Sequence, residues 1–348
     1  MSLLAFTFSF IIEKIILISV ILGGSLGIAM YSTWAERKVA AIMQDRKGPN
    51  RAGPFGFLQP LADGLKLFMK EEIIPSFSSK FIFILGPSLA MLMALITSAV
   101  IPWGPSFVSD KGSFSLQVAD INIGVLFVFG VVSLGVYGIM LGAWASNNKF
   151  SLLSALRAAS QAISYELAMG ISLIALIMLS GSLSLNDIVA NQHGINWYIF
   201  KQPLGFLIFL VCAFAELNRA PFDMAECESE LIGGYHTEFS SMKLGFYLFA
   251  EYINMFISSV LISTLYFGGY NYPGMDWVAL HASPILVSVI GVLVLLAKAI
   301  AFILFFMFIR WTLPRFRYDQ LMNLGWKNLI PLALFNMLLT AAIVLALN

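Results

Sequence analysis

The sequence predicts an all-α membrane protein: one polytopic bundle of about eight transmembrane helices, with an amphipathic helix on its surface. Three observations support this prediction. Hydrophobic residues make up 59% of the 348 residues and charged residues only 11%, with a mean hydropathy of +0.87. This composition exceeds what the core of a soluble domain requires. The hydrophobic residues also lie in runs long enough to cross a bilayer, and basic residues gather in alternate connections between the runs.

Eight apolar runs are candidate spans, because a spanning helix needs about 20 largely apolar residues. They cover residues 10–33, 81–103, 121–146, 160–181, 203–220, 244–268, 284–309 and 329–347. The first run lacks the basic leader and the cleavage site of a signal peptide, so we expect it to be retained. The fifth is the weakest, because Glu216 interrupts it. Either that carboxylate lies inside the membrane, or the helix is short or tilted.

The distribution of basic residues predicts the orientation of the bundle. The connections after the first, third, fifth and seventh runs hold 16 of the 20 Lys and Arg residues. By the positive-inside rule these connections face the cytoplasm or its organellar equivalent, and both termini face the other side. Residues 1–348 therefore form one integral membrane domain. Its cytoplasmic segments are a loop with an amphipathic helix at 34–80, an acidic loop at 216–243 and a basic loop at 310–328.

In residues 36–72, Gly and Pro residues oppose a long helix, and the segment then becomes periodic. The apolar side of the helical period consists of Phe57, Leu61, Leu65 and Phe68, and the polar side consists of Asp63, Lys66 and Lys70. This pattern predicts a short amphipathic helix at the membrane surface. A cytosolic helix packed on a partner would need the same pattern and remains the alternative.

The acidic loop crowds carboxylates beside apolar helices. Its acids are Glu216, Asp223, Glu226, Glu228, Glu230 and Glu238. Desolvation costs kcal/mol for each charge, so such acids pair, hold protons or line a wet cavity. The Glu-x-Glu-x-Glu spacing alone does not predict calcium, because no calcium-loop pattern surrounds it.

Three successive runs carry a carboxylate at a similar depth. Glu166 lies nine residues beyond Arg157 and Glu251 lies eight beyond Lys243, so each is roughly 12 Å from the cytoplasmic end at about 1.5 Å per residue. Glu216 lies near the same end of the fifth run. Carboxylates that share a partly dry site have raised pKa values and can pass protons. The alternative is that each acid pairs with a base; those available are Arg37, Arg157 and Arg219.

Lys298 is the deepest basic residue of the seventh run. It lies twelve residues before Arg310, which is about 18 Å along a helix and too deep for its amine to reach the interface easily. A buried lysine can exchange protons or balance a glutamate. A fixed ion pair inside the bundle is an equally simple interpretation.

The sequence offers no pattern for a cofactor or metal held by this chain. Cys212 and Cys227 form no CxxC pair, and the three histidines lack metal-ligand spacing. There is no glycine-rich dinucleotide turn and no phosphate-binding loop. We therefore expect no NADH, iron-sulfur or metal site, and the net charge of +1 gives no reason to expect nucleic acid.

Four predicted cytoplasmic stretches resemble one known family. They read ERKVAAIMQDRKGPNRAGPFGFLQPLADGLKLFMKEE, RAASQAISYE, AELNRAPFDMAECESELIGGYHTEFSSMK and RWTLPRFRYDQLMNLGWKNLIP. They are similar to the quinone-chamber membrane subunit, designated H, of respiratory complex I, the proton-pumping NADH-quinone oxidoreductase. The resemblance extends from the first helix to the last, and motifs of this length and order are highly specific.

The resemblance implies a membrane subunit that forms the quinone-access chamber at the junction with the peripheral arm. FMN and iron-sulfur clusters would belong to partner subunits, so this chain would not be catalytic alone. The implied partners are the other membrane-arm and peripheral-arm subunits, quinone and lipid. The proton channel is expected to comprise Glu166, Glu216, Glu226, Glu228, Glu230 and Glu251, to which we add Lys298 for its depth. The expected quinone chamber comprises Glu36, Arg37, Asp63, Arg219 and Phe222.

Two other functions share part of this pattern. The chain could be the ion-translocating anchor subunit of a membrane-bound hydrogenase or formate hydrogenlyase, although the long stretch after the first helix and the complete acidic loop favour the quinone enzyme. It could also be a stand-alone secondary ion transporter, but we find no internal repeat of the kind that such transporters commonly show. A bacterial plasma membrane is the preferred location, and an organellar inner membrane is also compatible.

Overall fold

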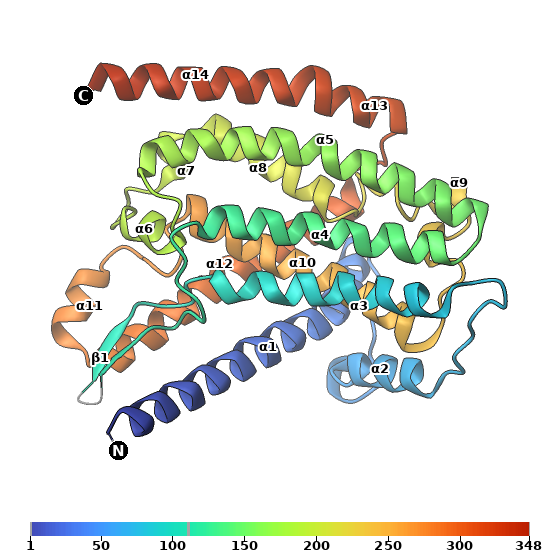
Figure 1. The fold of residues 1–348 in the computed structure, drawn as a ribbon, viewed down its shortest axis with the longest axis horizontal. Helices are drawn as coiled ribbons and strands as arrows, with labels where there is room; N and C mark the ends of the chain where they lie inside the picture. Colours follow the sequence, from blue (N-terminus) through green and yellow to red (C-terminus); the bar gives the residue numbers. More distant parts are fainter. Residues whose placement is uncertain (1, 110–111, 348) are drawn as a thin grey trace.

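Long helices lie side by side in this protein, and short helices and loops gather at two opposite ends (Figure 1). The structure is a computed structural model that describes residues 2–109 and 112–347. One end carries α2 (Gln59–Met69) and α9 (Glu228–Leu231), and we call it the α2 end. The opposite end, the α6 end, carries α6 (Leu185–Ala190) and α11 (Met275–His281). Both termini lie at the α6 end, in agreement with the predicted location of both termini on one side.

Among the described residues, seven helical segments are long and apolar enough to cross a membrane. They are α1 (Ser2–Met43), α3 (Lys80–Thr97), α4 (Gly124–Ala145), α5 (Lys149–Ser180), α10 (Ser241–Tyr266), α12 (Pro284–Thr312), and α13 (Tyr318–Asn323) joined to α14 (Ile330–Leu347) by a π-helical turn. In contrast, α8 (Pro203–Glu216) is apolar but has only 14 residues. The predicted polytopic helical bundle is confirmed, and the weakest predicted span is the short one.

The described chain contains a few smaller elements besides these helices. Short helical turns occur at α7 (Tyr198–Lys201) and at the 3-10 turns Pro54–Gly56, Ser98–Val100 and Gly234–His236. At the α6 end, β1 (Phe107–Ser109) pairs with β2 (Gly112–Phe114) in an antiparallel hairpin. The sequence does not predict this hairpin, because strands of three residues leave no alternating pattern to detect.

The first helix is longer than its hydropathy predicts. Falling hydropathy places residues 34–43 in a loop, but α1 continues as a helix to Met43. The segment is rich in strong helix formers, and its first Gly and Pro residues occur only at positions 48 and 49. The helix ends close to Asp45, which adopts a left-handed backbone conformation with φ of 49°. Glu36 and Arg37 are thus fixed on a helix.

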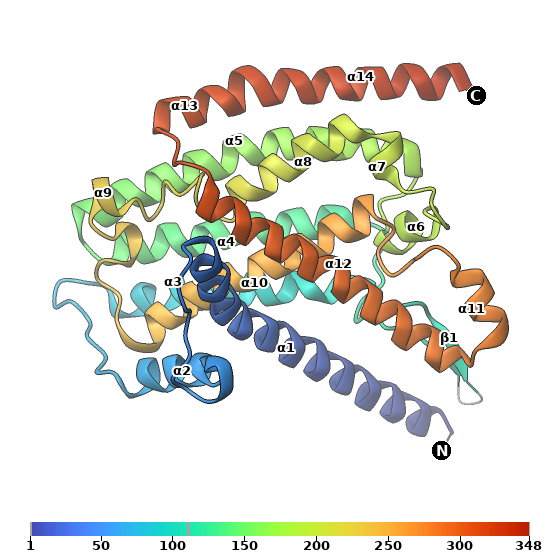
Figure 2. The same ribbon diagram turned by 180° about the vertical axis from the view of Figure 1, so that it is seen from behind.

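The middle of the bundle is occupied by α10, and α1 lies at its edge. In the apolar stretch of α10, 67% of the residues are buried inside the bundle, compared with 6% in the apolar stretch of α1. Figure 2 shows α1 crossing α10 near the α2 end and diverging from the bundle toward its own N-terminus. Polar residues on α10 are therefore enclosed by neighbouring helices, while much of α1 is free to face lipid or a partner.

Close packing of α3 against α4 depends on glycine. A Cβ atom placed on Gly86 of α3 would lie 2.7 Å from the Cα atom of Gly142 on α4, so only hydrogen fits there. Tyr247 of α10 reaches this contact and donates a hydrogen bond to the carbonyl of Gly138 at 3.0 Å. Helices α3, α4 and α10 consequently form a tight unit.

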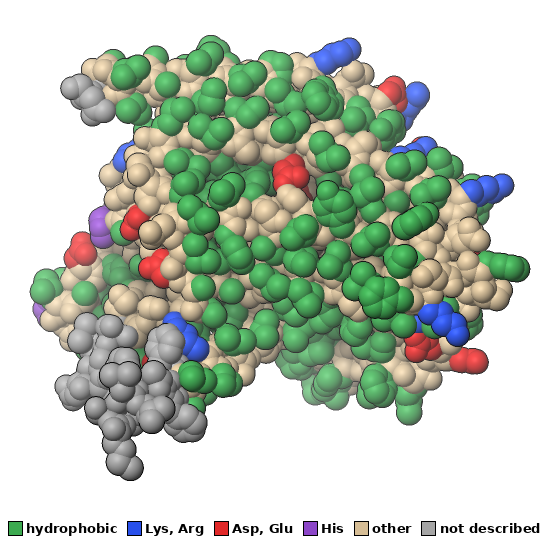
Figure 3. Space-filling model, viewed as in Figure 1, with side chains coloured by type: hydrophobic (Ala, Val, Ile, Leu, Met, Phe, Trp, Pro, Cys, Tyr) green, Lys and Arg blue, Asp and Glu red, His purple; other side chains and the backbone are tan. Residues whose placement is uncertain are grey.

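The surface has the distribution expected of a membrane protein. Hydrophobic side chains cover the middle of the face formed by α3, α4 and α5, and most Lys and Arg side chains visible on this face lie toward the α2 end (Figure 3). This arrangement agrees with a bundle whose central band contacts lipid and whose α2 end lies in water.

Candidate functional site

A cavity of about 700 Å³ lies at the α2 end between α1, α2 and α10. We call it the α2 cavity. Its polar lining includes Arg37 of α1, Asp63 of α2 and Tyr252 of α10, and its apolar lining includes Leu248 and Phe249 of α10. Arg37 and Asp63 form an ion pair across its edge, with 2.7 Å between Nη1 and Oδ2, although the angles are not those of a hydrogen bond. The cavity combines an apolar wall with a few polar groups, as small-molecule sites usually do.

The polar side of α2, rather than its apolar side, lines this cavity. The apolar residues Phe57, Leu61, Leu65 and Phe68 are all exposed in the isolated chain, which agrees with a helix that lies on a membrane or on a partner. None of these four residues lines the cavity.

Behind the α2 cavity lies a buried cluster of ion pairs, the Arg219 cluster, which comprises Glu36, Tyr252, Arg219, Arg310 and Glu251. Tyr252 lines the cavity and donates its hydroxyl to Glu36 Oε2 at 2.8 Å. Arg219 binds the same oxygen at 2.7 Å and reaches Glu251 Oε2 at 3.4 Å. Arg310 of α12 contacts the other oxygen of Glu36. One guanidinium thus joins a carboxylate beside the cavity to a carboxylate deeper in the bundle.

The turn after α8 presents Arg219 to both carboxylates. The chain leaves the helix through Asn218, which has a φ of 50°. Gln161 of α5 holds this turn, because its amide donates to the carbonyls of Ala215 and Phe222 at 2.6 and 2.7 Å. The guanidinium of Arg219 also stacks on the ring of Tyr252, with 4.0 Å between its carbon and the ring centroid. Charge, hydrogen bonding and stacking therefore fix a single orientation of Arg219.

The acidic loop folds back against α10 and brings further titratable groups to Glu251. Tyr235 donates its hydroxyl to Glu251 Oε1 at 2.9 Å, and His236 Nδ1 lies 3.4 Å from Glu226 Oε1. Burial, followed by the charge of Glu251, raises the pKa of Glu226 well above its usual range. Burial lowers the pKa of His236, which keeps its ring neutral near pH 7. Glu226 thus keeps its proton up to a higher pH than a free glutamate does.

Glu226, His236 and Glu251 also form a group of metal-ligand type, with ligand atoms within 4.8 Å of one another. The spacing of histidines along the chain could not predict this group, because its members come together only through the fold. The Arg219 guanidinium, which already pairs with Glu251, opposes a cation at this position.

Beyond Glu251 lie two small cavities that share Glu216, which we call the Glu216 cavities. One has a volume of about 50 Å³ and also contacts Glu251 and Tyr235, and the other has a volume of about 30 Å³ and lies between α4, α5, α8 and α10. Glu166 of α5 accepts a hydrogen bond from Ser133 of α4. The sequence predicts carboxylates at similar depth on α5, α8 and α10, and the fold brings Glu216 and Glu251 to one pair of cavities.

Other predicted site residues lie elsewhere. Glu230 is half-exposed and pairs with Arg157 at 2.5 Å, and the side chain of Glu228 lies outside the described part of the structure. Phe222 packs between Tyr165 and Phe316 in the apolar core and does not line the α2 cavity. The roles predicted for these three residues from the sequence stay predictions.

Lys298 also lies apart from the carboxylates. Its ammonium group donates to the carbonyls of Phe267, Gly269 and Asn271 at 2.7, 2.8 and 2.7 Å. These carbonyls follow the C-terminal end of α10 at the α6 end. The sequence allows proton exchange, charge balance with a glutamate or a fixed ion pair for Lys298, and in the structure its ammonium group caps a helix end.

The basic loop supports the acidic loop from outside. Arg315 pairs with Asp223 Oδ2 at 2.5 Å, and the backbone amide of Phe316 donates to the carbonyl of Pro221 at 3.2 Å. Burial outweighs the charge of Arg315 and leaves the pKa of Asp223 raised. This pairing of the two loops cannot be inferred from sequence spacing, because about 90 residues separate them.

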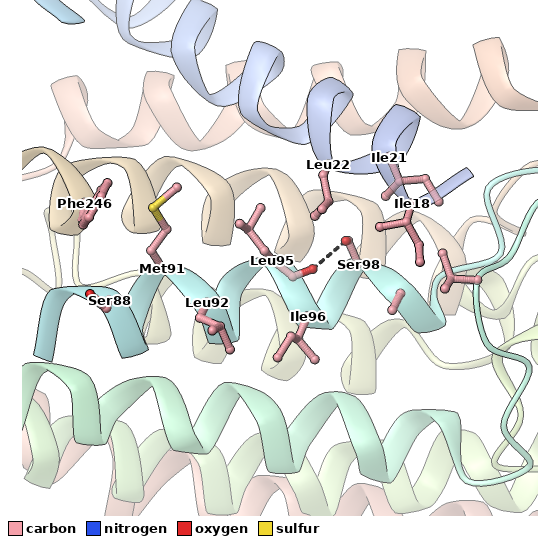
Figure 4. A pocket seen from close by; sticks show the side chains of 12 residues that line it. Ile18, Ile21, Leu22, Ser88, Met91, Leu92, Leu95, Ile96, Ser98 and Phe246 are labelled. Atoms are coloured by element: carbon pink, nitrogen blue, oxygen red, sulfur yellow. Dashed lines mark hydrogen bonds between the residues drawn. The ribbon is translucent and has the colours of Figure 1, made fainter. Parts of the chain in front are cut away.

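An apolar groove of about 460 Å³ runs along α3 beside α1 and contains no reactive group (Figure 4). Its wall includes Leu22 of α1, Met91 and Leu92 of α3, and two serines whose hydroxyls bond to their own helix. Ser88 donates to the carbonyl of Ile84 at 2.9 Å and Ser98 to the carbonyl of Leu95 at 2.6 Å. A surface without free polar groups suits contact with hydrocarbon, and the chemistry of the protein must lie elsewhere.

Comparison with known proteins places this geometry in a family. The model of the family described as NADH dehydrogenase matches residues 15–341. The chain belongs to the NADH dehydrogenase family. A member from Flavobacterium johnsoniae, named as the NADH-quinone oxidoreductase subunit designated H, is 60% identical over 97% of this chain and 96% of its own length. Relatives with that designation from Cytophaga hutchinsonii and Thermomicrobium roseum are 62% and 49% identical over 97% and 93% of this chain and 98% and 94% of their own lengths.

Within the NADH dehydrogenase family, the match includes both the residues around the α2 cavity and the acidic loop. The matched range begins inside α1 and ends inside α14, so it spans every element that lines the cavities. The resemblance inferred from four sequence stretches is therefore confirmed over nearly the whole chain.

Proposed function

We propose that this chain is the membrane subunit of a proton-translocating NADH-quinone oxidoreductase, in which the α2 cavity admits quinone and the linked carboxylates respond to its reduction. The observation that carries the proposal is the contact series from Tyr252 through Glu36 and Arg219 to Glu251. It begins at the wall of the α2 cavity and ends at the larger of the two Glu216 cavities. The named relatives supply the reaction class.

The cavity suits an amphipathic substrate such as a quinone. Leu244, Leu248 and Phe249 form an apolar wall, and Arg37, Asp63 and Tyr252 provide polar groups. A ring with carbonyl oxygens can bond to the polar groups while its isoprenoid tail stays against the apolar wall. The electrons would come from iron-sulfur clusters and FMN of partner subunits, because the chain carries no pattern that would hold either group.

Electrons transferred to quinone add negative charge in the cavity until protons neutralise it. A unit charge roughly 8 Å away changes the energy of a second charge by about 2 kcal/mol at an effective dielectric near 20, which corresponds to more than one pKa unit. Glu36 and Arg219 would feel this change first. The shared guanidinium would then shift its balance between Glu36 and Glu251, and Glu251 with Glu226 would gain or release a proton toward Glu216 and Glu166.

The proposal predicts that Glu166, Glu216 and Glu251 are required for coupled turnover. In assembled complex, replacing each by Gln should lower NADH-driven quinone reduction and proton uptake roughly 100-fold, the usual loss when a proton-transfer group is removed. Electron transfer from NADH to a water-soluble artificial acceptor should stay normal. Unimpaired quinone reduction and proton uptake in all three variants would overturn the proposed function.

A separate prediction concerns quinone entry. Arg37→Ala and Asp63→Asn should each raise the apparent KM for quinone roughly tenfold, equivalent to about 1.4 kcal/mol, with little change in kcat. The matched control is Arg46→Ala, because Arg46 is exposed near the end of α1 and does not line the α2 cavity. Steady-state kinetics with quinones of different tail length provide the measurement. Parental KM values in both variants would remove these residues from the route of entry.

The membrane subunit is expected to work with other membrane-arm and peripheral-arm subunits in a bacterial plasma membrane. Glu166 is only partly buried on α5, and a carboxylate at this depth needs a polar neighbour that a further subunit can supply. An anchor subunit of a hydrogenase would use the same scaffold without quinone. Purified complex that contains FMN and iron-sulfur clusters, and that reduces quinone with NADH, would exclude that alternative.

A further inference from the structure

Asn254 and Ser258 face the Glu216 cavities from α10. Asn254 lines both cavities, and Ser258 lines the smaller one. Both lie on the helix face that carries Glu251, because positions i, i+3 and i+7 share a face. Neither residue stands out from the sequence.

Within the described structure, neither side chain makes a hydrogen bond with protein. The hydroxyls of Ser259 and Ser263 on the same helix bond to the carbonyls of Met255 and Ser259, at 2.7 and 2.8 Å. Ser258 makes no such bond, and the amide of Asn254 has two donors and an acceptor to satisfy. Both side chains are half-buried, and half-buried polar groups bond to water when the protein provides no partner.

The two cavities have room for that water. A bound water needs about 10–15 Å³ of such space, so cavities of about 30 and 50 Å³ hold roughly two and four waters. Glu216 and Asn254 line both cavities, and Glu251 lines the larger one. Because Glu216, Glu251 and Asn254 all line the larger cavity, waters between the two carboxylates can bond to the Asn254 amide.

We propose that Asn254, assisted by Ser258, is a positioning residue that holds a short chain of waters between Glu216 and Glu251. This inference rests on the proposed function, since it assigns the link between two of its carboxylates. A proton leaves the carboxyl oxygen of one glutamate for the nearest water, each water passes a different proton onward, and the last water protonates the other carboxylate. Asn254 gains and loses no proton, and the number of protons is conserved.

The test uses two substitutions of Asn254 in the whole complex. Asn254→Leu removes the polar group and narrows the cavity, and should lower coupled quinone reduction roughly tenfold while raising the ratio of rates in H2O and D2O. Asn254→Ser keeps a hydroxyl and leaves space for one more water, so it should retain activity within about twofold of the parent. The matched control is Ser259→Ala, which removes a hydroxyl that bonds only within α10. It should leave both the rate and the isotope ratio unchanged.

The outcomes separate this inference from the proposed function. If Asn254→Leu turns over like the parent while Glu216→Gln and Glu251→Gln do not, the water link is wrong and the function stands. If the two glutamate variants are also normal, the proposed function itself fails. Should Asn254→Leu not assemble, a high-resolution map of the parent complex decides: ordered waters beside Asn254 in both cavities support the link, and dry cavities overturn it.

Discussion

Replacing Arg219 by Met should abolish coupled quinone reduction and reduce the amount of assembled complex. Arg219 is buried between Glu36 and Glu251, and removing one partner from a buried ion cluster costs about 3–5 kcal/mol because the remaining charges lose their compensation. Glu36 would keep Arg310, but Glu251 would lose the guanidinium and keep the hydroxyl of Tyr235 and its hydrogen bond with Glu226. The measurement is the content of this protein in membranes together with NADH–quinone activity per assembled complex.

Arg219→Lys refines this prediction. An ammonium group is compact and cannot bond to two carboxylates in the way a planar guanidinium does, so this variant should assemble but lose most of its coupled activity. The matched control is Arg317→Met, since Arg317 pairs with Asp319 on the surface, where such pairs contribute less than about 1 kcal/mol. Full coupled activity in Arg219→Lys would show that the shared guanidinium is not the link.

Lys298→Met is expected to destabilise the protein strongly without interrupting proton transfer. The variant leaves the carbonyls of Phe267, Gly269 and Asn271 without their ammonium donor. Each unsatisfied buried acceptor costs on the order of 1–3 kcal/mol, so the complex should inactivate at a clearly lower temperature. At permissive temperature, the number of protons taken up for each NADH oxidised should equal that of the parent.

Lys201→Met provides the comparison for Lys298. Lys201 is exposed, and its amine lies over the ring of Tyr198, so its loss should change neither thermal stability nor proton uptake. Normal thermal stability with lost proton uptake in Lys298→Met would return Lys298 to the proton channel that its depth along the helix suggests.

Hydropathy and basic-residue counts predict the bundle well because they depend on each segment alone. The lengths of the spans, the amphipathic α2 and the common depth of Glu166, Glu216 and Glu251 all follow from residue spacing along a helix. The same reasoning places the end of α1 too early, since low hydropathy does not by itself end a helix.

Pairing between distant segments cannot be predicted in this way. Glu36 and Arg310 are separated by 274 residues, and Glu36 and Tyr252 by 216. Helical periodicity indicates which side of a helix a residue occupies but not which helix lies opposite. For this reason the sequence places Phe222 at the quinone chamber, where the structure shows core packing, and gives no sign of Asn254 or Gln161.

A change of charge in the α2 cavity should reach the carboxylates around Glu251, and infrared difference spectra of the complex with oxidised and reduced quinone test this most directly. Because the pKa of Glu226 is raised, this acid keeps its proton between about pH 4.3, near which a free glutamate ionises, and its own higher pKa. At a pH within that interval, found by titrating the carboxyl band of the oxidised complex, the parent should show a change in protonated-carboxyl absorption on quinone reduction, and Glu226→Gln should lack that change. Identical carboxyl bands in the parent and the variant would contradict a charge link between the cavity and these acids.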